Sequence, residues 1–258
     1  MVQELKEKGN ECFRLGNYEE AVKTYTQAIN SSEQVNQSFL SQLYSNRALC
    51  YKKLGNYETC RTDSIEAIEL DEKNIKAHLL CGQAYLELGK YKEDLQFIEV
   101  GIKRITRAYS LCGGQSRRVW EKELETYLYR GKKLLFLKNK ELQEKLVEEV
   151  ILADYTPQAK EMGERLRSFI KKEIELPSFL LCPITSKVMR DPVVLPSGIS
   201  CEREAASSLT RDPFTNASIN PSNVVSNTTL KTTIEEFLNE HPWAFEYSPS
   251  QLYQQIPF

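Results

Sequence analysis

The tetrapeptide LGNY occupies Leu15–Tyr18 and again Leu54–Tyr57, and the similar LGKY occupies Leu88–Tyr91. Successive copies begin 39 and 34 residues apart. A small residue stands six positions before each copy and another ten positions after its tyrosine, at Gly9, Ala48, Gly82, Ala28, Ala67 and Gly101. A repeat of this length with small residues at fixed places predicts three pairs of helices, each joined at a glycine turn.

This pattern is typical of the tetratricopeptide (TPR) repeat, in which helix pairs stack because one pair cannot bury its apolar face alone. Extra residues around Ser31–Ser38 predict a longer loop between the first two copies. The alternative, three unrelated helical hairpins with a common turn sequence, leaves the other aligned positions unexplained. We therefore expect a TPR domain in residues 1–112.

Composition excludes several classes of protein. The 258 residues are 41 % hydrophobic and 27 % charged, as in an ordinary globular protein. A net charge of −2 argues against a dedicated nucleic-acid binder, and no apolar run is long enough for a membrane span. The start MVQELKEKGN lacks an apolar leader, and the seven cysteines include no CxxC, so we expect reduced thiols in the cytosol or nucleus. With only two histidines, we expect no metal site and no cofactor.

Four polar side chains are expected to converge on the first helices of the stack. Lys6 and Asn10 are four residues apart and share a helix face in the first copy. Asn46 and Lys76 lie on the corresponding helices of the second and third copies. Ammonium and amide N–H groups suit carboxylates, and a peptide that ends in an acidic residue presents two of them. Taken singly, an exposed lysine on a helix is usually just solvated, so the prediction rests on the set of four.

The stretches ELKEKGN, YSNRALCY and IKAHLLCGQAYLE resemble the TPR domain of the CHIP family (carboxyl terminus of heat-shock-cognate-interacting protein), chaperone-associated ubiquitin ligases. The resemblance implies that the four residues form a two-carboxylate clamp for the acidic C-terminal tails of heat-shock chaperones. Leu80 stands where many such clamps have a second basic residue, and the CHIP family is also apolar there. The resemblance also implies that the peptide residues preceding the bound C-terminus contact three apolar side chains, Phe13, Leu49 and Leu79. Ordinary core packing explains each of the three equally well.

The middle of the chain predicts a helical hairpin in residues 113–175. Residues 116–149 contain no proline and carry leucines near helical spacing, which predicts one long helix. Thr156 and Pro157 predict the start of a second helix. Its apolar stripe is Ala159, Met162, Leu166, Phe169 and Ile170. In the CHIP family this segment dimerises the protein, so the resemblance implies a homodimer. Basic residues here alternate with glutamates, which favours a solvated face over nucleic-acid binding.

The run CPITSKVMRDPVVLPSGISCERE at residues 182–204 predicts two short strands around a turn. Helices are expected at Glu202–Thr210 and Thr228–Glu240. This pattern resembles the U-box, which has the shape of a RING finger without zinc. Residues 176–240 contain only Cys182 and Cys201 as cysteine or histidine, too few for two zinc sites. Polar residues are then expected to hold the fold, namely Asp191, Glu202, Arg203, Glu204 and Asp212.

The U-box resemblance implies a shallow apolar groove that docks a ubiquitin-conjugating enzyme. The implied contact residues are Pro183, Ile184, Ser186, Pro213 and Asn216. Ser186 stands at a place that is aromatic in the CHIP family, and Asn216 at one that is usually basic, so activity is expected to be lower or to depend on another contact. Such ligases act by positioning and have no catalytic nucleophile. With no histidine nearby, both cysteines are expected to pack rather than carry ubiquitin.

We therefore expect a mainly α protein with a small α+β domain. It comprises a TPR domain (1–112), a dimerising hairpin (113–175), a U-box (176–247) and a tail of no assigned role (248–258). The expected function is ubiquitination of misfolded client proteins held by chaperones, with neither nucleic acid nor membrane as partner. Two alternatives stay open: a non-enzymatic co-chaperone with a degenerate U-box, and a TPR scaffold for a different acidic C-terminus.

Overall fold

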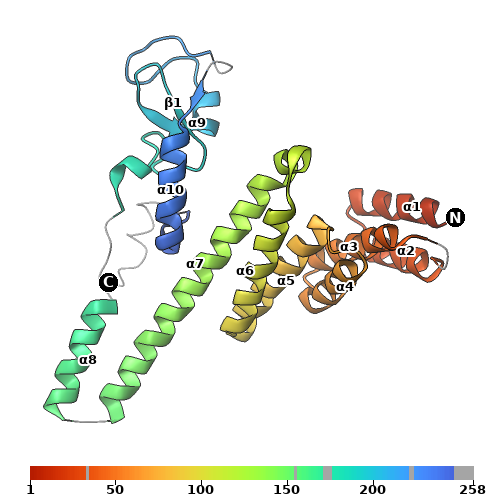
Figure 1. The fold of residues 1–258 in the computed structure, drawn as a ribbon, viewed down its shortest axis with the longest axis horizontal. Helices are drawn as coiled ribbons and strands as arrows, with labels where there is room; N and C mark the ends of the chain where they lie inside the picture. The colour runs from red at the N-terminus through yellow and green to blue at the C-terminus, as the bar shows by residue number, and fades with distance from the viewer. Residues whose placement is uncertain (33–34, 154–155, 171–175, 221–223, 247–258) are drawn as a thin grey trace. The chain divides into compact units, whose positions relative to one another are not determined.

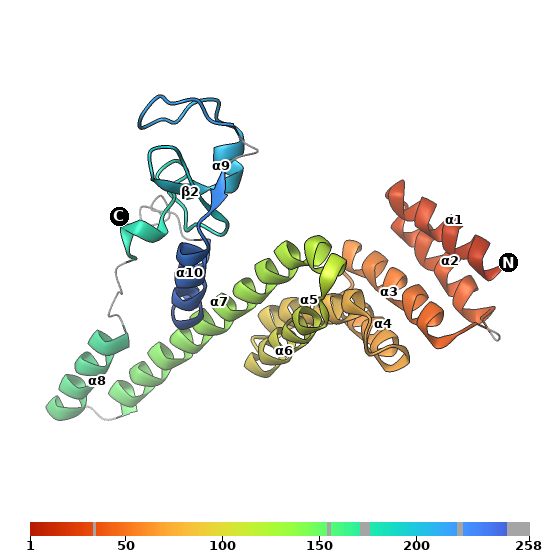
Figure 2. The same cartoon turned by 45° about the horizontal axis from the view of Figure 1, so that its top comes forward.

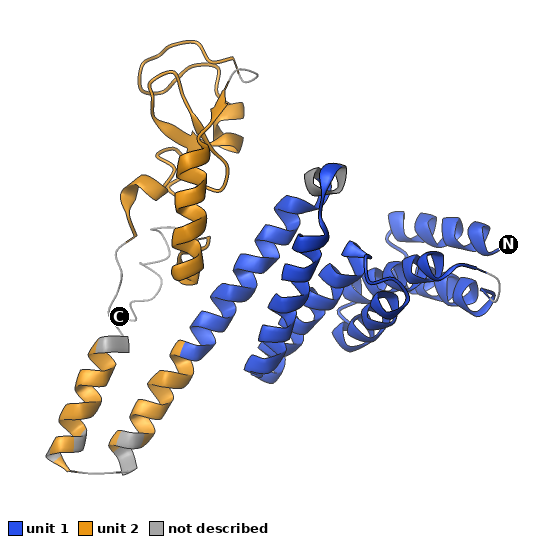
Figure 3. Ribbon diagram, in the orientation of Figure 1, with its two compact units in different colours: residues 1–139 blue, residues 140–258 orange. Residues whose placement is uncertain are grey.

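The computed structural model describes residues 1–32, 35–153, 156–170, 176–220 and 224–246 (Figure 1). It divides the chain into two compact units, Met1–Asn139 and Lys140–Phe258 (Figure 3). The boundary falls inside α7 (Gly114–Ala153), which is one continuous helix as expected. No helix in the described part of the chain is both long and apolar enough to cross a membrane.

The first unit is a stack of helix pairs, which confirms the TPR prediction (Figure 2). The paired helices are α1 (Val2–Arg14) with α2 (Tyr18–Asn30), α3 (Gln37–Lys53) with α4 (Tyr57–Leu70), and α5 (Ile75–Lys92) with α6 (Leu95–Leu111). Gly16 and Gly55 form the first two turns with φ of 80° and 77°, values that glycine adopts without strain. Gly82 lets α5 and α6 approach, since a Cβ there would lie 2.5 Å from Ile105 Cγ1.

The third copy differs from the prediction, because its LGKY does not form a turn. α5 continues through Gly89, and the chain turns later, at Glu93, with φ of 55°. The Asp94 carboxylate then caps α6 by accepting two backbone N–H bonds, at 2.8 and 3.4 Å, whereas α2 and α4 begin without a side-chain cap. Gly89 is buried, and a Cβ there would lie 2.7 Å from Ile98 Cγ1. The aspartate cap therefore sets the turn, and the glycine serves helix packing.

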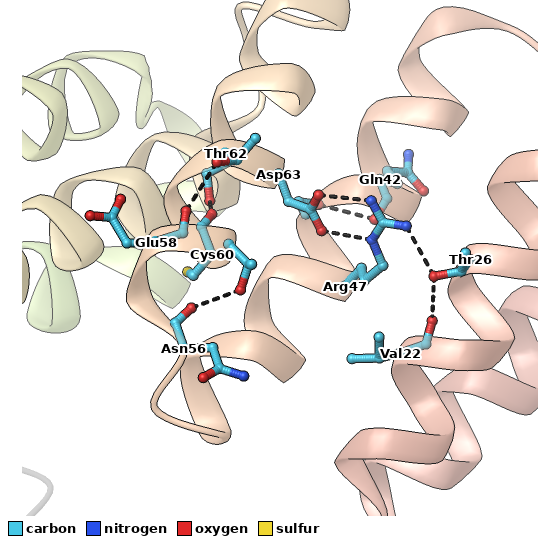
Figure 4. Close-up of polar contacts among 12 residues, drawn as sticks. Val22, Thr26, Gln42, Arg47, Asn56, Glu58, Cys60, Thr62 and Asp63 are labelled. Atoms are coloured by element: carbon cyan, nitrogen blue, oxygen red, sulfur yellow. Dashed lines mark hydrogen bonds and ion pairs between the residues drawn. The ribbon is translucent and has the colours of Figure 1, made fainter.

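A buried arginine joins the two helices of the second repeat and links them to the first repeat (Figure 4). Arg47 on α3 donates from Nε and Nη2 to the two carboxylate oxygens of Asp63 on α4, at 2.7 and 2.8 Å. Its Nη1 also donates to Thr26 Oγ1 on α2 at 3.0 Å. The Arg47 and Asp63 side chains are 16 % and 8 % exposed. Removing one partner of such a pair typically costs about 3–5 kcal/mol, because the other charge stays buried and unpaired.

The second unit contains the C-terminal part of α7, with α8 (Pro157–Ile170) beside it as the predicted hairpin (Figure 1). The two helices are in close contact at Gly163, where a Cβ would overlap the side chain of Ile151. The side chains of Ala159, Phe169 and Ile170, which belong to the predicted stripe, lie outside the described residues, as does the tail 248–258.

The end of the chain forms a small α+β fold around a three-stranded antiparallel sheet in the order β2-β1-β3. Its elements are η1 (Ser178–Leu180), β1 (Pro192–Val194), β2 (Ser200–Glu202), α9 (Arg203–Ser207), β3 (Val225–Ser226), α10 (Thr228–Glu240) and η3 (Pro242–Ala244). α10 is confirmed, and α9 is shorter than predicted. The sequence reading missed β3, because a two-residue strand carries no alternating pattern. Fully buried side chains of this core include Leu180, Met189, Val193, Cys201 and Phe245.

Candidate functional site

The four polar residues expected to form a clamp lie together on α1, α3 and α5; we call Lys6, Asn10, Asn46 and Lys76 the clamp. Lys76 Nζ donates to Asn46 Oδ1 at 2.6 Å. Asn46 Nδ2 in turn donates to Asn10 Oδ1 at 3.3 Å. Lys6 completes the group, since it lies near enough for its charge to lower the pKa of Lys76. The structure thus brings together side chains that lie up to 70 positions apart in the sequence.

Neither ammonium group of the clamp has a carboxylate partner within the described residues. Lys6 Nζ donates to Gln42 Oε1 at 2.7 Å, and Lys76 donates to an amide oxygen. Other lysines of the first unit pair with glutamates, at distances of 2.5 to 3.4 Å. Within the described residues, these two half-buried ammonium groups have neutral hydrogen-bond acceptors, so they retain a positive charge that a bound anion would neutralise.

The charge of Lys76 is sensitive to its surroundings. The pKa of Lys76 is lowered from 10.5 to about 8, chiefly by burial; Cys50 acts in the opposite direction, and the charge of Lys6 contributes to the lowering. A carboxylate bound between the two lysines would favour their charged forms. The clamp is therefore suited to anions, and its charge changes within an experimentally accessible pH range.

The three apolar contacts expected near the clamp differ in exposure. Phe13 and Leu49 are half-buried, and their role stays a prediction. Leu79 is only 2 % exposed and belongs to the core cluster that contains Leu86 and Ile105. The expectation for Leu79 was therefore wrong: it packs against the neighbouring helices and has no surface to offer a peptide.

Gln42 and Phe39 on α3 contact the clamp and were not predicted. Gln42 accepts the hydrogen bond from Lys6, and the same ammonium lies 4.6 Å from the centroid of the Phe39 ring. Gln42 lies four residues before Asn46, so helical spacing could have placed it on the same face. These two side chains hold the Lys6 ammonium in position without neutralising it.

Tyr25 contacts the clamp from α2, the second helix of its pair. Its hydroxyl donates to Asn10 Oδ1 at 2.7 Å, and the residue is 2 % exposed. Burial raises the pKa of Tyr25 well above its ordinary value, so the hydroxyl keeps its proton. No spacing pattern points to this residue, because in sequence it occupies a core position.

The two loops expected to dock a conjugating enzyme are built alike. Residues 182–187 (CPITSK) and 212–217 (DPFTNA) share proline in second place and threonine in fourth. In each loop the N–H of the fifth residue donates to the carbonyl of the first, at 2.7 and 2.8 Å, and the N–H of the first donates to the carbonyl of the sixth, at 2.8 Å in both. The fifth residues, Ser186 and Asn216, have φ of 55° and 59°. This shared backbone leaves positions two to five of both loops exposed.

The first residue of each loop anchors it with a buried acceptor. Asp212 is 1 % exposed, and its carboxylate accepts the N–H groups of Ser197 at 2.7 Å and Phe214 at 2.9 Å. Cys182 Sγ accepts the N–H of Glu202 at 3.3 Å. Burial alone would raise the pKa of both anchors, but the hydrogen bonds they accept lower both. Hydrogen bonds therefore hold both loops, and the described residues contain no cluster of three or more metal-binding side chains.

Other predicted polar residues brace the segment between the loops. The Glu202 carboxylate accepts the N–H of Arg190 at 2.7 Å, and Arg203 Nε donates to Asp191 Oδ2 at 2.6 Å. Cys182 and Cys201 are almost fully buried, at 1 % and 0 % exposure, which agrees with the prediction that they pack in the core. At this exposure neither thiol is accessible to form a thioester.

All five predicted contact residues are exposed on these loops, and Phe214 joins them. Phe214 is 47 % exposed and takes the place in the second loop that Ile184, 39 % exposed, takes in the first. The matching proline–x–threonine pattern of the two loops could have identified it. An exposed aromatic side chain is thus present on the second loop, whereas the first loop has Ser186 where the resemblance places an aromatic residue.

Comparison with known proteins supports both halves of this description. The family model for the U-box domain matches residues 176–243, and the model for anaphase-promoting complex, cyclosome, subunit 3 matches residues 15–100. The E3 ubiquitin-protein ligase CHIP of Arabidopsis thaliana is 30 % identical over 280 aligned positions, which cover 95 % of this chain and 96 % of that protein.

Other similar proteins match about half of this chain. Hsp70-Hsp90 organizing protein 1 of Glycine max is 34 % identical over 119 residues, 46 % of this chain and 20 % of that protein. The solved structure of the Arabidopsis OM64 TPR domain is 30 % identical, with a TM-score of 0.37, and covers 48 % of this chain and 93 % of that domain.

Proposed function

The chain belongs to the CHIP family of U-box E3 ubiquitin-protein ligases, and we propose that its clamp recruits heat-shock chaperones by their acidic C-terminal tails. The name of the Glycine max relative, which matches the TPR region, refers to Hsp70 and Hsp90. A tail that ends in an acidic residue carries two carboxylates, the number that the two ammonium groups of the clamp would neutralise.

One observation carries this proposal: within the described residues, the two positive charges of the clamp donate hydrogen bonds to neutral oxygen atoms and pair with no carboxylate. Lys6 and Lys76 are bonded to the amide oxygens of Gln42 and Asn46. Such an arrangement costs part of the solvation of both charges and gains only hydrogen bonds to uncharged acceptors in return. Bound carboxylates would replace those bonds, in which only the donor is charged, with contacts in which donor and acceptor carry opposite charges.

The U-box half transfers ubiquitin without a covalent intermediate of its own. We propose that loops 182–187 and 212–217 bind a ubiquitin-loaded conjugating enzyme through Pro183, Ile184, Pro213 and Phe214, with Ser186 and Asn216 as flanking polar contacts. The enzyme's thioester then meets a client lysine by positioning alone. Buried thiols at both cysteines support this mechanism, because neither could accept ubiquitin.

We further propose that the ligase is a homodimer whose substrates are misfolded clients held by the chaperone. Apolar side chains on α7 and α8 remain exposed in the described chain, which supports a helical dimer interface; they include Leu142, Leu146, Met162 and Leu166. All seven cysteines are free thiols, which supports a reducing compartment, the cytosol or nucleus. We also propose that the TPR domain ends at residue 112, the hairpin at residue 175 and the U-box at residue 247.

The chaperone role is tested with a peptide that ends in an acidic residue, prepared with a free C-terminal carboxylate and as its C-terminal amide. We expect the amide to bind about 30-fold or more weakly, because one charge-assisted contact is lost. Isothermal titration calorimetry on the full chain measures both affinities. Equal affinities for the two peptides would contradict a carboxylate clamp.

Tail binding is also expected to depend on pH. The Lys76 pKa of about 8 in the free protein means that the ammonium is mostly charged below pH 8. Bound carboxylates stabilise the charged form and raise this pKa, so binding takes up a proton above pH 8. Affinity should therefore be constant at lower pH and fall about tenfold for each unit above pH 8. Titrations across this range measure the slope, and Lys76→Arg, which stays charged, should abolish it.

A further inference from the structure

A carboxylate accepts hydrogen bonds and donates none, so every group that the clamp presents to it must be a donor. Lysine meets this condition in any orientation. An asparagine amide meets it only when its NH₂ group faces the ligand, because the opposite orientation places an oxygen atom against the carboxylate. The orientation of Asn10 therefore decides whether it attracts or repels a bound tail.

A chain of hydrogen bonds sets that orientation. Lys76 is only a donor, so the oxygen atom of Asn46 must face it, and the NH₂ group of Asn46 then points toward Asn10. Asn10 meets it with its oxygen atom, which leaves its own NH₂ group without a partner among the described residues. The link from Asn46 to Asn10 is long, however, at 3.3 Å.

The short bond to Asn10 comes from Tyr25, at 2.7 Å to the same oxygen atom. The tyrosine ring is itself fixed, since it packs against Gly9, where a Cβ would lie 2.7 Å from Tyr25 Cε1. A flipped Asn10 would lose the bond from Asn46, because two NH₂ groups would face each other. Tyr25 thus adds the shorter of the two bonds that hold the Asn10 amide in place. The bond from Asn46 sets which way the amide faces, since a tyrosine hydroxyl could also accept an N–H.

We propose that Tyr25, a buried residue of α2, is a positioning residue of the clamp that keeps the N–H groups of Asn10 directed at the tail carboxylate. This inference rests on the proposed chaperone-tail function. The competing explanation is that Asn10 merely satisfies a buried hydroxyl, which would make the contact a matter of folding alone. The two explanations differ in what they predict for binding.

A double-mutant cycle in the full chain separates them, with the free-acid and amide peptides as probes. Tyr25→Phe keeps the ring against Gly9 and removes only the hydroxyl, so the fold should persist, as thermal unfolding would verify. We expect it to weaken free-acid binding about fivefold, and to reduce the preference for acid over amide. In the Asn10→Ala background the same change should cost nothing, since Tyr25 acts through Asn10.

The matched control is Tyr51→Phe. Tyr51 is half-buried on α3 and forms no side-chain hydrogen bond within the described residues, so its change should leave affinity unaltered. If Tyr25→Phe binds like the wild type, or if its cost is the same with and without Asn10, the role of Tyr25 is wrong. If the wild-type chain itself fails to prefer the free acid, the chaperone-tail function is contradicted, and the role of Tyr25 with it.

Discussion

Lys76→Ala is expected to weaken binding of an acidic C-terminal peptide by roughly 30- to 100-fold, because it removes a charge-assisted contact from a partly buried site. The change also leaves Asn46 Oδ1 without its donor at 2.6 Å, so the amide that orients Asn10 is released. The loss should therefore exceed that of a surface charge. Calorimetry or fluorescence anisotropy with the free-acid peptide measures it.

Lys73→Ala is the matched control for this change. Lys73 lies three residues earlier, is exposed and has no ion pair among the described residues, so its removal tests the general effect of one positive charge. Exposed charges contribute little, and we expect less than about a threefold change. Comparable losses for the two variants would mean that the peptide senses net charge and not a clamp.

Ile184→Asp is expected to reduce ubiquitin transfer by at least about tenfold, because it places a charge in the apolar contact with the conjugating enzyme. Ile184 is 39 % exposed, and the backbone bonds of its loop do not involve its side chain, so the domain should remain folded. The measurement is the rate at which a loaded conjugating enzyme discharges ubiquitin in the presence of the ligase.

Ile184→Leu, which keeps an apolar side chain of the same size, should retain most of the transfer rate. The two sites should also separate cleanly: Ile184→Asp should keep its affinity for the tail peptide, and Lys76→Ala should keep its discharge rate. If the wild type discharges no conjugating enzyme from a broad panel, the alternative of a non-enzymatic co-chaperone with a degenerate U-box is correct.

Local patterns were enough to predict most of the fold. The 34-residue spacing predicted the stack, and the count of cysteines and histidines predicted a C-terminal domain held by polar contacts. The prediction of a turn at LGKY failed for a local reason that the repeat alignment does not show. The Asp94 side chain caps α6, whereas Asn17 and Asn56, at the same place before α2 and α4, form no side-chain cap. Repeat alignment gave the helices their order, while capping decided where the third turn falls.

The candidate sites were predicted less completely, for two physical reasons. Leu79 and Phe13 are both apolar residues on the first helix of a repeat, so the sequence does not distinguish them. The packing of neighbouring helices decides that Leu79 is buried and Phe13 only half-buried. Tyr25 reaches the clamp from a second helix, at a position that the repeat pattern assigns to the core. Phe214 was different, since its equivalence to Ile184 was already readable from the repeated loop sequence.

The central claim is that one chain couples chaperone-tail capture to ubiquitin transfer. Its most direct test is reconstituted ubiquitination of a chaperone-bound client, with either the full-length chaperone or one that lacks its acidic C-terminal tail. We expect ubiquitin chains on the client with the full-length chaperone and a loss to background without the tail. Equal modification of the client with the tailless chaperone would contradict the claim.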